Sequence, residues 1–109
     1  MVSYFVSYRG DAPDREAFLR NYAERHARVL AEFPGIRSLV LHTAADWTDP
    51  FPVNPGGRLL LAQMSFDSTG ALNAALASEA RARARQDLRS FPQFQGEITH
   101  QAMTSRKVF

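Results

Sequence analysis

His26 is the side chain whose type and position most readily indicate chemistry in this chain of 109 residues. It follows Phe18 by eight residues and Tyr22 by four, and on a helix these intervals put the three side chains on one face. Since that face is otherwise apolar, we expect it to point to the core and to hold a titratable ring there. Such an imidazole can act as a general acid or base, or donate a hydrogen bond to a ligand carbonyl. The alternative is a core histidine bonded to a backbone carbonyl.

Three other polar side chains could assist His26, and each has a structural alternative. Tyr22, one helical turn earlier, could bring a phenol to the same pocket or serve only in core packing. Asp87 could orient an imidazole or act as a base, or it could pair on a helix surface with a neighbouring arginine such as Arg83. Gln63 could place an amide in the sheet surface beneath a ligand, or line a polar gap.

Two candidates for substrate binding lie beside or within a long expected loop over residues 44–57. His42 comes just before this loop, and Trp47 lies within it together with Phe51. Loops longer than about a dozen residues in a compact domain are often functional lids. The alternative is that these aromatic side chains hold the loop against a partner subunit.

The three histidines, His26, His42 and His100, do not have the spacing of a metal site. They fall on different expected elements, show no His-x-x-x-His pattern and have no accompanying carboxylate motif. The chain also has no cysteine, which excludes disulfide bonds, thiolate catalysis and cysteine-based zinc sites. We therefore expect no metal site.

The composition is typical of one globular domain over residues 1–109, with 45% hydrophobic and 22% charged residues. The net charge is only +2, and the arginines of residues 81–89 are interleaved with alanine, as on a solvated helix face rather than a nucleic-acid surface. The first residues do not resemble a signal peptide, and the longest apolar run, 59–62, is too short to span a bilayer. We expect a cytoplasmic protein that binds neither nucleic acid nor membrane.

Hydrophobic periodicity predicts four strands and two helical regions around these candidates. Residues 2–9 alternate between two faces, as in a β-strand. A helix begins after the N-cap Asp14 and ends at Pro34. A second helical region, within residues 68–92, is interrupted at Ser78, which indicates two short helices or a kinked one. Further strands are predicted at residues 36–43, 58–66 and 96–106.

The order β-α-β-β-α-β in a chain of this size predicts a ferredoxin-like α+β fold. Its four-stranded antiparallel sheet has the strand order 4-1-3-2, and both helical regions cover one face. The strand at 58–66 is apolar on both sides, with Leu59 and Leu61 on one and Leu60 and Met64 on the other. A soluble monomer rarely exposes a contiguous apolar sheet face. We therefore expect a homodimer, with ~800 Å² buried on each chain if the interface is of standard size.

Segments 18–30 (FLRNYAERHARVL) and 33–37 (FPGIR) resemble the EthD-like family of dimeric α+β barrel proteins. Residues 64–68 (MSFDS) resemble the strand-to-helix junction of that family, and Asp87 and Phe91 resemble a further feature. The resemblance implies a ferredoxin-like domain that pairs into a barrel, with a cleft between sheet and helices. It supports Asp87 beside the candidate catalytic histidine, and Phe91 as a candidate for substrate binding.

The resemblance also implies a function, because the wider superfamily includes cofactor-independent monooxygenases of aromatic polyketides, lactone isomerases and dehydratases. We therefore expect a small cofactor-independent enzyme for a hydrophobic, aromatic or polyketide-like molecule, with His26 as acid or base. Oxygenation, isomerisation and dehydration all begin with a comparable proton transfer, so the residues do not separate them. The alternatives are a non-catalytic ligand-binding or accessory protein of a catabolic pathway and a haem-binding barrel.

Overall fold

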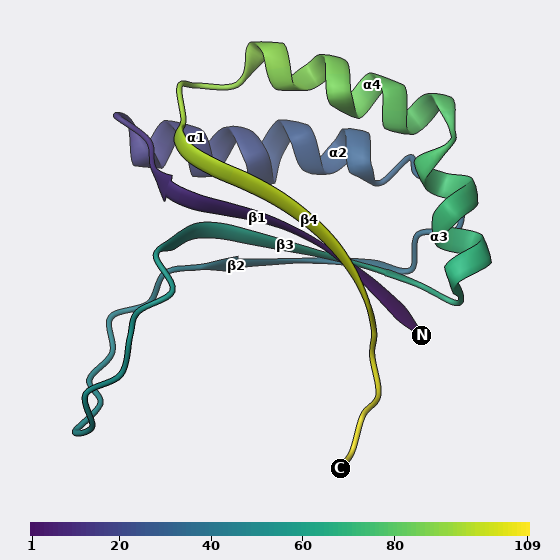
Figure 1. The fold of residues 1–109 in the computed structure, drawn as a ribbon. Helices are drawn as coiled ribbons and strands as arrows, with labels where there is room; N and C mark the ends of the chain where they lie inside the picture. The colour runs from purple at the N-terminus through teal and green to yellow at the C-terminus, as the bar shows by residue number, and fades with distance from the viewer.

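The computed structural model describes residues 1–109 and contains one four-stranded antiparallel sheet with helices on one face (Figure 1). The strands are β1 (Val2–Asp11), β2 (Ser38–Thr43), β3 (Arg58–Phe66) and β4 (Gln95–Thr104). Their spatial order is β2-β3-β1-β4, with β1 and β3 in the centre. This order is the predicted 4-1-3-2 read from the opposite edge, so the predicted fold class and topology are confirmed.

The first helical segment is continuous and has three parts. An α-helix α1 (Arg15–Asn21) is followed by a π-helical turn η1 (Tyr22–His26) and a final α-helical turn α2 (Ala27–Leu30). The side chain of Asp14 caps it, as predicted, by accepting a hydrogen bond from the Ala17 N–H. The sequence indicated a helix here but not its π-helical turn.

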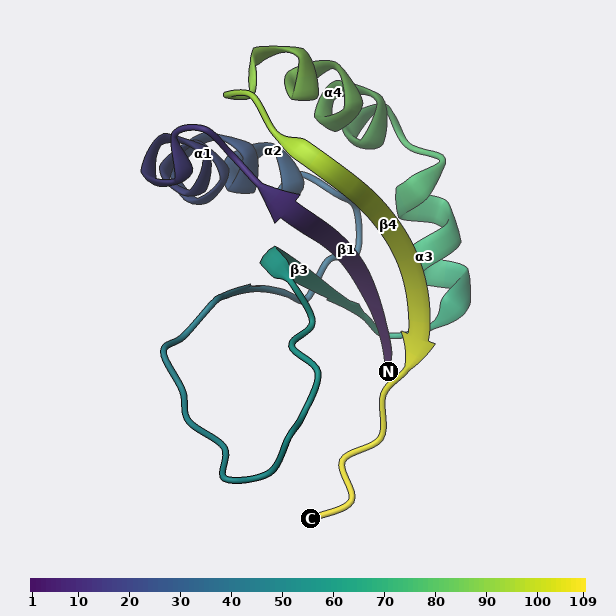
Figure 2. The ribbon, with the colours of Figure 1, turned by 60° about the vertical axis from the view of Figure 1, so that its left-hand side comes forward.

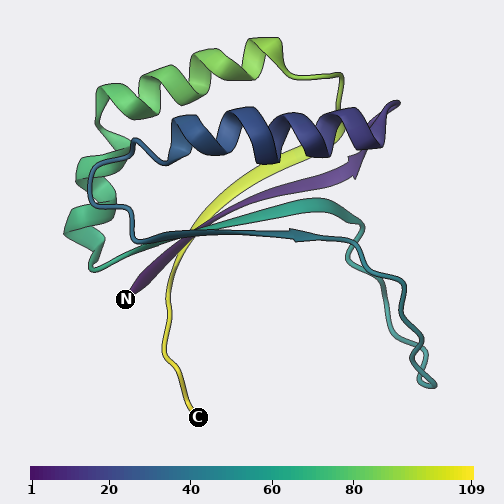
Figure 3. The ribbon, with the colours of Figure 1, turned by 180° about the vertical axis from the view of Figure 1, so that it is seen from behind.

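The second helical region is divided into two helices rather than one kinked helix. They are α3 (Thr69–Leu76) and α4 (Glu79–Asp87), and a 3₁₀ turn η2 (Leu88–Ser90) follows. The division falls at Ser78, whose hydroxyl accepts from the Arg81 N–H and so begins α4. All helices lie on the same face of the sheet, as Figure 3 shows from behind.

The core lies between this helical layer and the sheet. Alternate residues of β1 face the helices, and Tyr4 and Tyr8 pair in register with Met64 and Leu60 of β3, which are also buried. At one end of the core, aromatic rings pack edge to face at centroid distances of 5.4–5.8 Å. This aromatic cluster comprises Tyr8, Phe18, Tyr22, Phe91 and Phe94.

Two parts of the chain remain outside the core. The loop at residues 44–57 extends away from the helices, and Figure 2 shows it as an open loop. The edge strand β4 is exposed along its whole length. No helix combines the length and apolarity that crossing a membrane requires.

The backbones of β1 and β4 approach closely where Gly10 pairs with Gly96. Both glycines have positive φ, 136° and 149°. A Cβ on Gly96 would lie 2.0 Å from the carbonyl oxygen of Arg9, and one on Gly10 would lie 2.2 Å from that of Gln95. Only glycine fits this pair of positions, and the close pairing fixes the start of β4 just after the aromatic cluster.

Replacing Gly96 by alanine is expected to lower the free energy of unfolding by at least about 1–3 kcal/mol, because the backbone must adopt a strained conformation and relieve a collision. The matched control is Gly70→Ala at the start of α3, where the new Cβ would meet only the Ser68 hydroxyl at 3.7 Å. Gly70→Ala should be neutral or stabilise by up to about 1 kcal/mol. Urea unfolding measures both, and equal stability of the two variants would contradict the close approach.

Candidate active site

The π-helical turn η1 places His26 in the core. In an α-helix each step of four residues overshoots one turn by about 40°, so His26 would point about 80° away from Phe18. The π-helical turn, closed by the Ala27 N–H bond to the Tyr22 carbonyl, is wider and rotates less per residue. The turn therefore brings the His26 side chain back to the buried face of the helix. Only 4% of the surface of His26 is exposed.

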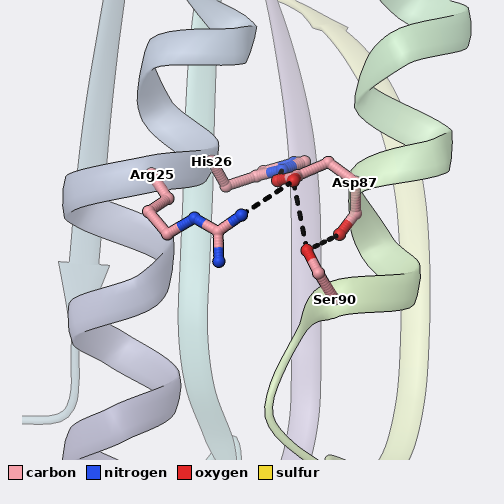
Figure 4. A network of polar contacts seen from close by, with 4 residues as sticks. All are labelled: Arg25, His26, Asp87 and Ser90. Atoms are coloured by element: carbon pink, nitrogen blue, oxygen red, sulfur yellow. Dashed lines mark hydrogen bonds and ion pairs between the residues drawn. The ribbon is translucent and has the colours of Figure 1, made fainter.

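Asp87, at the end of α4, holds the buried ring from the second helical region (Figure 4). Nδ1 of His26 lies 2.9 Å from Oδ2 of Asp87. The carboxylate also accepts a hydrogen bond from the Ser90 hydroxyl at 3.2 Å, and the Arg25 guanidinium lies 3.9 Å from it. Two predicted site residues 61 positions apart are therefore in direct contact.

The pKa values of both His26 and Asp87 are lowered, the first by burial and the second by pairing, which leaves the histidine neutral and the aspartate charged. Burial lowers the pKa of His26, and the bond to Asp87 raises it again only in part. The same bond is the main reason that the pKa of Asp87 is below its usual value. At neutral pH the ring is therefore neutral and the carboxylate ionised. Because a carboxylate can only accept, Nδ1 carries the proton and Nε2 is left as the basic nitrogen.

A small cavity of about 40 Å³ lies on the inner side of His26, between the helices and the sheet. Tyr4, Val6 and Tyr8 of β1 form part of its wall, and Tyr22 and His26 form another part. Nine of its 13 lining residues are hydrophobic. Burial raises the pKa of Tyr8 to about 12 and also raises that of Tyr22, so both phenols are neutral donors at physiological pH. The one side-chain hydrogen bond that His26 makes to the protein is through Nδ1, so Nε2 has no protein partner.

Asp87 and Phe91 lie around His26 rather than in the cavity wall. Phe91 packs edge-on against the imidazole, with ring centroids 4.7 Å apart, and Tyr22 does so from another side at 4.9 Å. Asp87 lines a separate surface groove with Ser90. The carboxylate therefore contacts the ring from outside the cavity and does not line it.

The remaining predicted site residues are elsewhere. His42 and Gln63 contact each other, Nε2 to Oε1 at 3.1 Å, and Gln63 also donates to the Ser3 hydroxyl at 3.3 Å. Their register positions place them on the sheet face opposite the helices. Trp47 lies in the long loop with 61% of its surface exposed. The structure thus brings together His26, Asp87, Tyr22 and Phe91, but not these three.

Three polar residues of the cavity were not among the sequence candidates for substrate binding. Arg81 and Arg85 of α4 line it, together with His100 of β4. Burial and the two guanidinium groups lower the pKa of His100. The sequence pattern assigned all the arginines of this segment to a solvated face, and Arg85 is indeed exposed, but Arg81 is half-buried and both also line the cavity. Their spacing of four residues, which puts both on one side of a helix, was the available signal.

The three histidines are far from forming a metal site, since no three His, Asp or Glu side chains come close enough together to hold an ion. His26 and His100 line the same cavity, whereas His42 is on the other face of the sheet. The chemistry available at this site is therefore that of a neutral imidazole, phenols and guanidinium groups.

Comparison with solved structures identifies the fold. Over 97% of this chain and 99% of the other, it superposes with a TM-score of 0.76 and 20% identity on an EthD (ethyl tert-butyl ether D) family protein from Bacillus halodurans. A monooxygenase of Streptomyces coelicolor from the gene ActVA-Orf6, in complex with nanaomycin D, superposes with a TM-score of 0.69 and 20% identity over 99% of this chain and 89% of the other. SnoaB, a cofactor-independent oxygenase from Streptomyces nogalater, superposes with a TM-score of 0.64 and 20% identity over 98% of this chain and 95% of the other.

The sequence matches no protein-family model and no curated protein sequence. At 20% identity the structural likenesses establish the fold alone, which is a ferredoxin-like α+β domain. The resemblance to the EthD-like family noted from the sequence agrees with this fold, since one of the similar structures is an EthD family protein.

The pairing of His26 with Asp87 predicts how the histidine titrates. In the folded protein His26 should titrate below 6.5, the ordinary histidine value, so its contribution to stability is present above about pH 6.5 and is lost as the pH falls through the folded pKa. Asp87→Asn removes the charge that raises the pKa of His26, so the variant should titrate at still lower pH. NMR of the imidazole nitrogens measures this shift and the Nδ1–H tautomer.

Asp67→Asn is the matched control, because Asp67 is an exposed carboxylate that pairs with Arg37. This change should leave the titration of His26 unaltered. An unchanged or higher pKa of His26 in Asp87→Asn, or a proton on Nε2 at neutral pH, would contradict the assignment.

Proposed function

We propose that this chain is a cofactor-independent enzyme in which His26 removes a proton from a hydrophobic, aromatic or polyketide-like small molecule. One observation carries the proposal: a neutral imidazole whose Nδ1 is held by Asp87 stands in the wall of a mostly apolar cavity with Nε2 unbonded. A basic nitrogen at a cavity that has no protein partner is available to a ligand. Ligand sites of this kind combine an apolar wall with a few polar groups.

The proposed first step is proton transfer to Nε2 from a carbon acid next to a carbonyl, or from a phenol. Asp87 stabilises the imidazolium that results, as a positioning residue behind the ring. Oxygen on the substrate becomes negative at the same time. The neutral phenols of Tyr8 and Tyr22 are suited to donate hydrogen bonds to it.

Oxygenation is the reaction type that we favour after this step, since two of the similar structures are oxygenases by name. The carbanion of an anthrone-like substrate can react with dioxygen, so that a methylene becomes a carbonyl and one molecule of water leaves. This balance needs no external reductant. Isomerisation and dehydration begin with the same proton transfer and are alternative outcomes of the assay.

The volume of the cavity requires that it widen when a substrate binds. About 40 Å³ accommodates roughly three water molecules, whereas a benzene ring fills a cavity of about 150 Å³. The wall best able to move is α4, because its buried contacts are made by the small side chains of Ala80 and Ala84. Small side chains lose little apolar burial when they separate.

Turnover of an anthrone tests the proposed base. Uptake of dioxygen and formation of the quinone, above the rate without enzyme, should fall about 100-fold or more in His26→Gln, since general bases contribute about 10²–10⁴ to rates. In the wild type, kcat/KM should rise with pH to a plateau above the pKa of His26. Arg83→Gln on the outer side of α4 is the control and should keep full activity.

Circular dichroism should show that His26→Gln remains folded. Full turnover by this variant would exclude His26 as the base. Conversion of the anthrone without uptake of dioxygen would reject oxygenation.

We further propose that two copies pair through the sheet face opposite the helices. This face carries Val40 and Met103, which are 45% and 49% exposed, together with a hollow lined by Phe5 and Leu61. Polar side chains such as Gln63 share the face, so it is less apolar than the sequence of β3 alone suggested. A second copy would cover these apolar groups, which supports a homodimer.

Light scattering at micromolar concentration should give twice the 12.2 kDa of one chain. Leu61→Arg places a charge in the proposed interface and should shift the protein toward the monomer. Ala82→Arg, on the exposed side of α4, is the matched control and should leave the dimer intact. A wild-type mass equal to that of one chain would refute the pairing.

A further inference from the structure

Arg81 and Arg85 are the two arginines of α4 that line the cavity. They are four residues apart and therefore lie on the same side of the helix. Arg83, between them, points elsewhere and pairs with Glu32 at 3.3 Å. Neither Arg81 nor Arg85 has a carboxylate within 4.0 Å, although the chain contains 11 acidic residues.

The cavity wall as a whole lacks negative charge. Its titratable residues are tyrosines, histidines and these two arginines, and it includes no aspartate or glutamate. Asp87, the acidic residue nearest to His26, is bonded to Nδ1 on the other side of the ring. Two permanent cations thus stand at a largely apolar cavity without a counter-charge from the protein.

Arg81 is half-buried beside the cavity, whereas Arg85 is exposed and lines the cavity from its rim. The guanidinium of Arg81 lies over the ring of Tyr4, 6.0 Å from its centroid, and such a contact restrains the group beside the sheet. The imidazole of His100 on β4 lies 6.0 Å from the same ring, tilted by 37° to it. Burial is the main cause that lowers the pKa of His100, and the positive charges of the two arginines lower it further.

We propose that Arg81 and Arg85 bind a carboxylate of the substrate, so that the substrate class is a hydrophobic or aromatic carboxylic acid. The inference rests on the proposed function, because it concerns the same cavity. A planar guanidinium matches a carboxylate with two parallel hydrogen bonds, and a charged pair of this kind is stronger where water is partly excluded. The acid group would be held at α4 and the apolar body beside Tyr8 and Tyr22, where Nε2 of His26 can reach it.

Binding of matched ligands tests the charge preference without any need for turnover. The probes are 2-naphthoate and 2-naphthamide, which share a shape but differ in charge, and calorimetry gives the dissociation constants. The acid should bind the wild type at least about tenfold more tightly than the amide, since a hydrogen bond to a charged group is worth that ratio or more. The double variant Arg81→Gln/Arg85→Gln should abolish this difference.

Arg83→Gln is the control and should retain the preference for the acid. Equal affinity for acid and amide, no binding of the acid at about 1 mM, or an equal loss in Arg83→Gln would overturn the proposal. Tighter, arginine-dependent binding of 2-naphthyl phosphate would replace the carboxylate by a phosphate ester and so would also overturn it. Thermal unfolding of each variant, including the single variants Arg81→Gln and Arg85→Gln, distinguishes a loss of binding from a loss of folding.

The same ligands test the carboxylate site independently of the proposal that His26 is the catalytic base. His26→Gln should keep the preference for the acid even though it loses turnover. If the preference is absent while turnover of the anthrone still depends on His26, only the carboxylate site is refuted. If the preference is present while turnover is independent of His26, only the catalytic proposal is refuted.

Discussion

The hydrogen bond between His26 and Asp87 is the constraint on which the helical layer depends. An imidazole buried among aromatic rings requires a polar partner, because an unsatisfied donor in an apolar layer is costly. The partner comes from the end of α4, so one bond joins the two helical regions that the chain makes 61 residues apart. It also places η2 and Phe91 over the ring, and the aromatic cluster then connects this point to β1 and the start of β4. His26, which this bond fixes in place, also lines the cavity between the helices and the sheet.

Much of the fold could be predicted because its determinants are local. Alternating residues in β1, the cap at Asp14 and the break at Ser78 each act within a few residues, and together they specify the element order. The π-helical turn was missed, although the buried residues Phe18, Tyr22, His26 and Leu30 follow one another at intervals of four rather than 3.6. A strict interval of four over three steps is wider than an α-helix allows on one face, and it is the signal that an additional residue has been accommodated.

The candidate site was predictable in part, for a related reason. The side of a helix on which His26 and Tyr22 lie follows from spacing alone, whereas the face of a sheet on which His42 or Gln63 lies depends on pairing with distant strands. His100 shows the same dependence, since its register with Val6 is what turns it toward the helices. The place of Arg81 and Arg85 at the cavity was not predicted, because the alternation of arginine with alanine in α4 conceals a division between two sides of the helix. Only the packing of α4 over the sheet shows which side is which.

The π-helical turn also has a consequence for comparing this chain with its relatives. The turn holds one residue more than an α-helix would use to span the same distance, so a homologue can lose a residue here without breaking the helix. In an alignment without a gap at this turn, residues on one side of it would be paired with positions about 100° away about the helix axis. An alignment that confines gaps to loops would then pair His26 with a neighbour of its true counterpart. At identities near 20%, the equivalent of this histidine is better assigned by superposition of the turn than by matching letters along the helix.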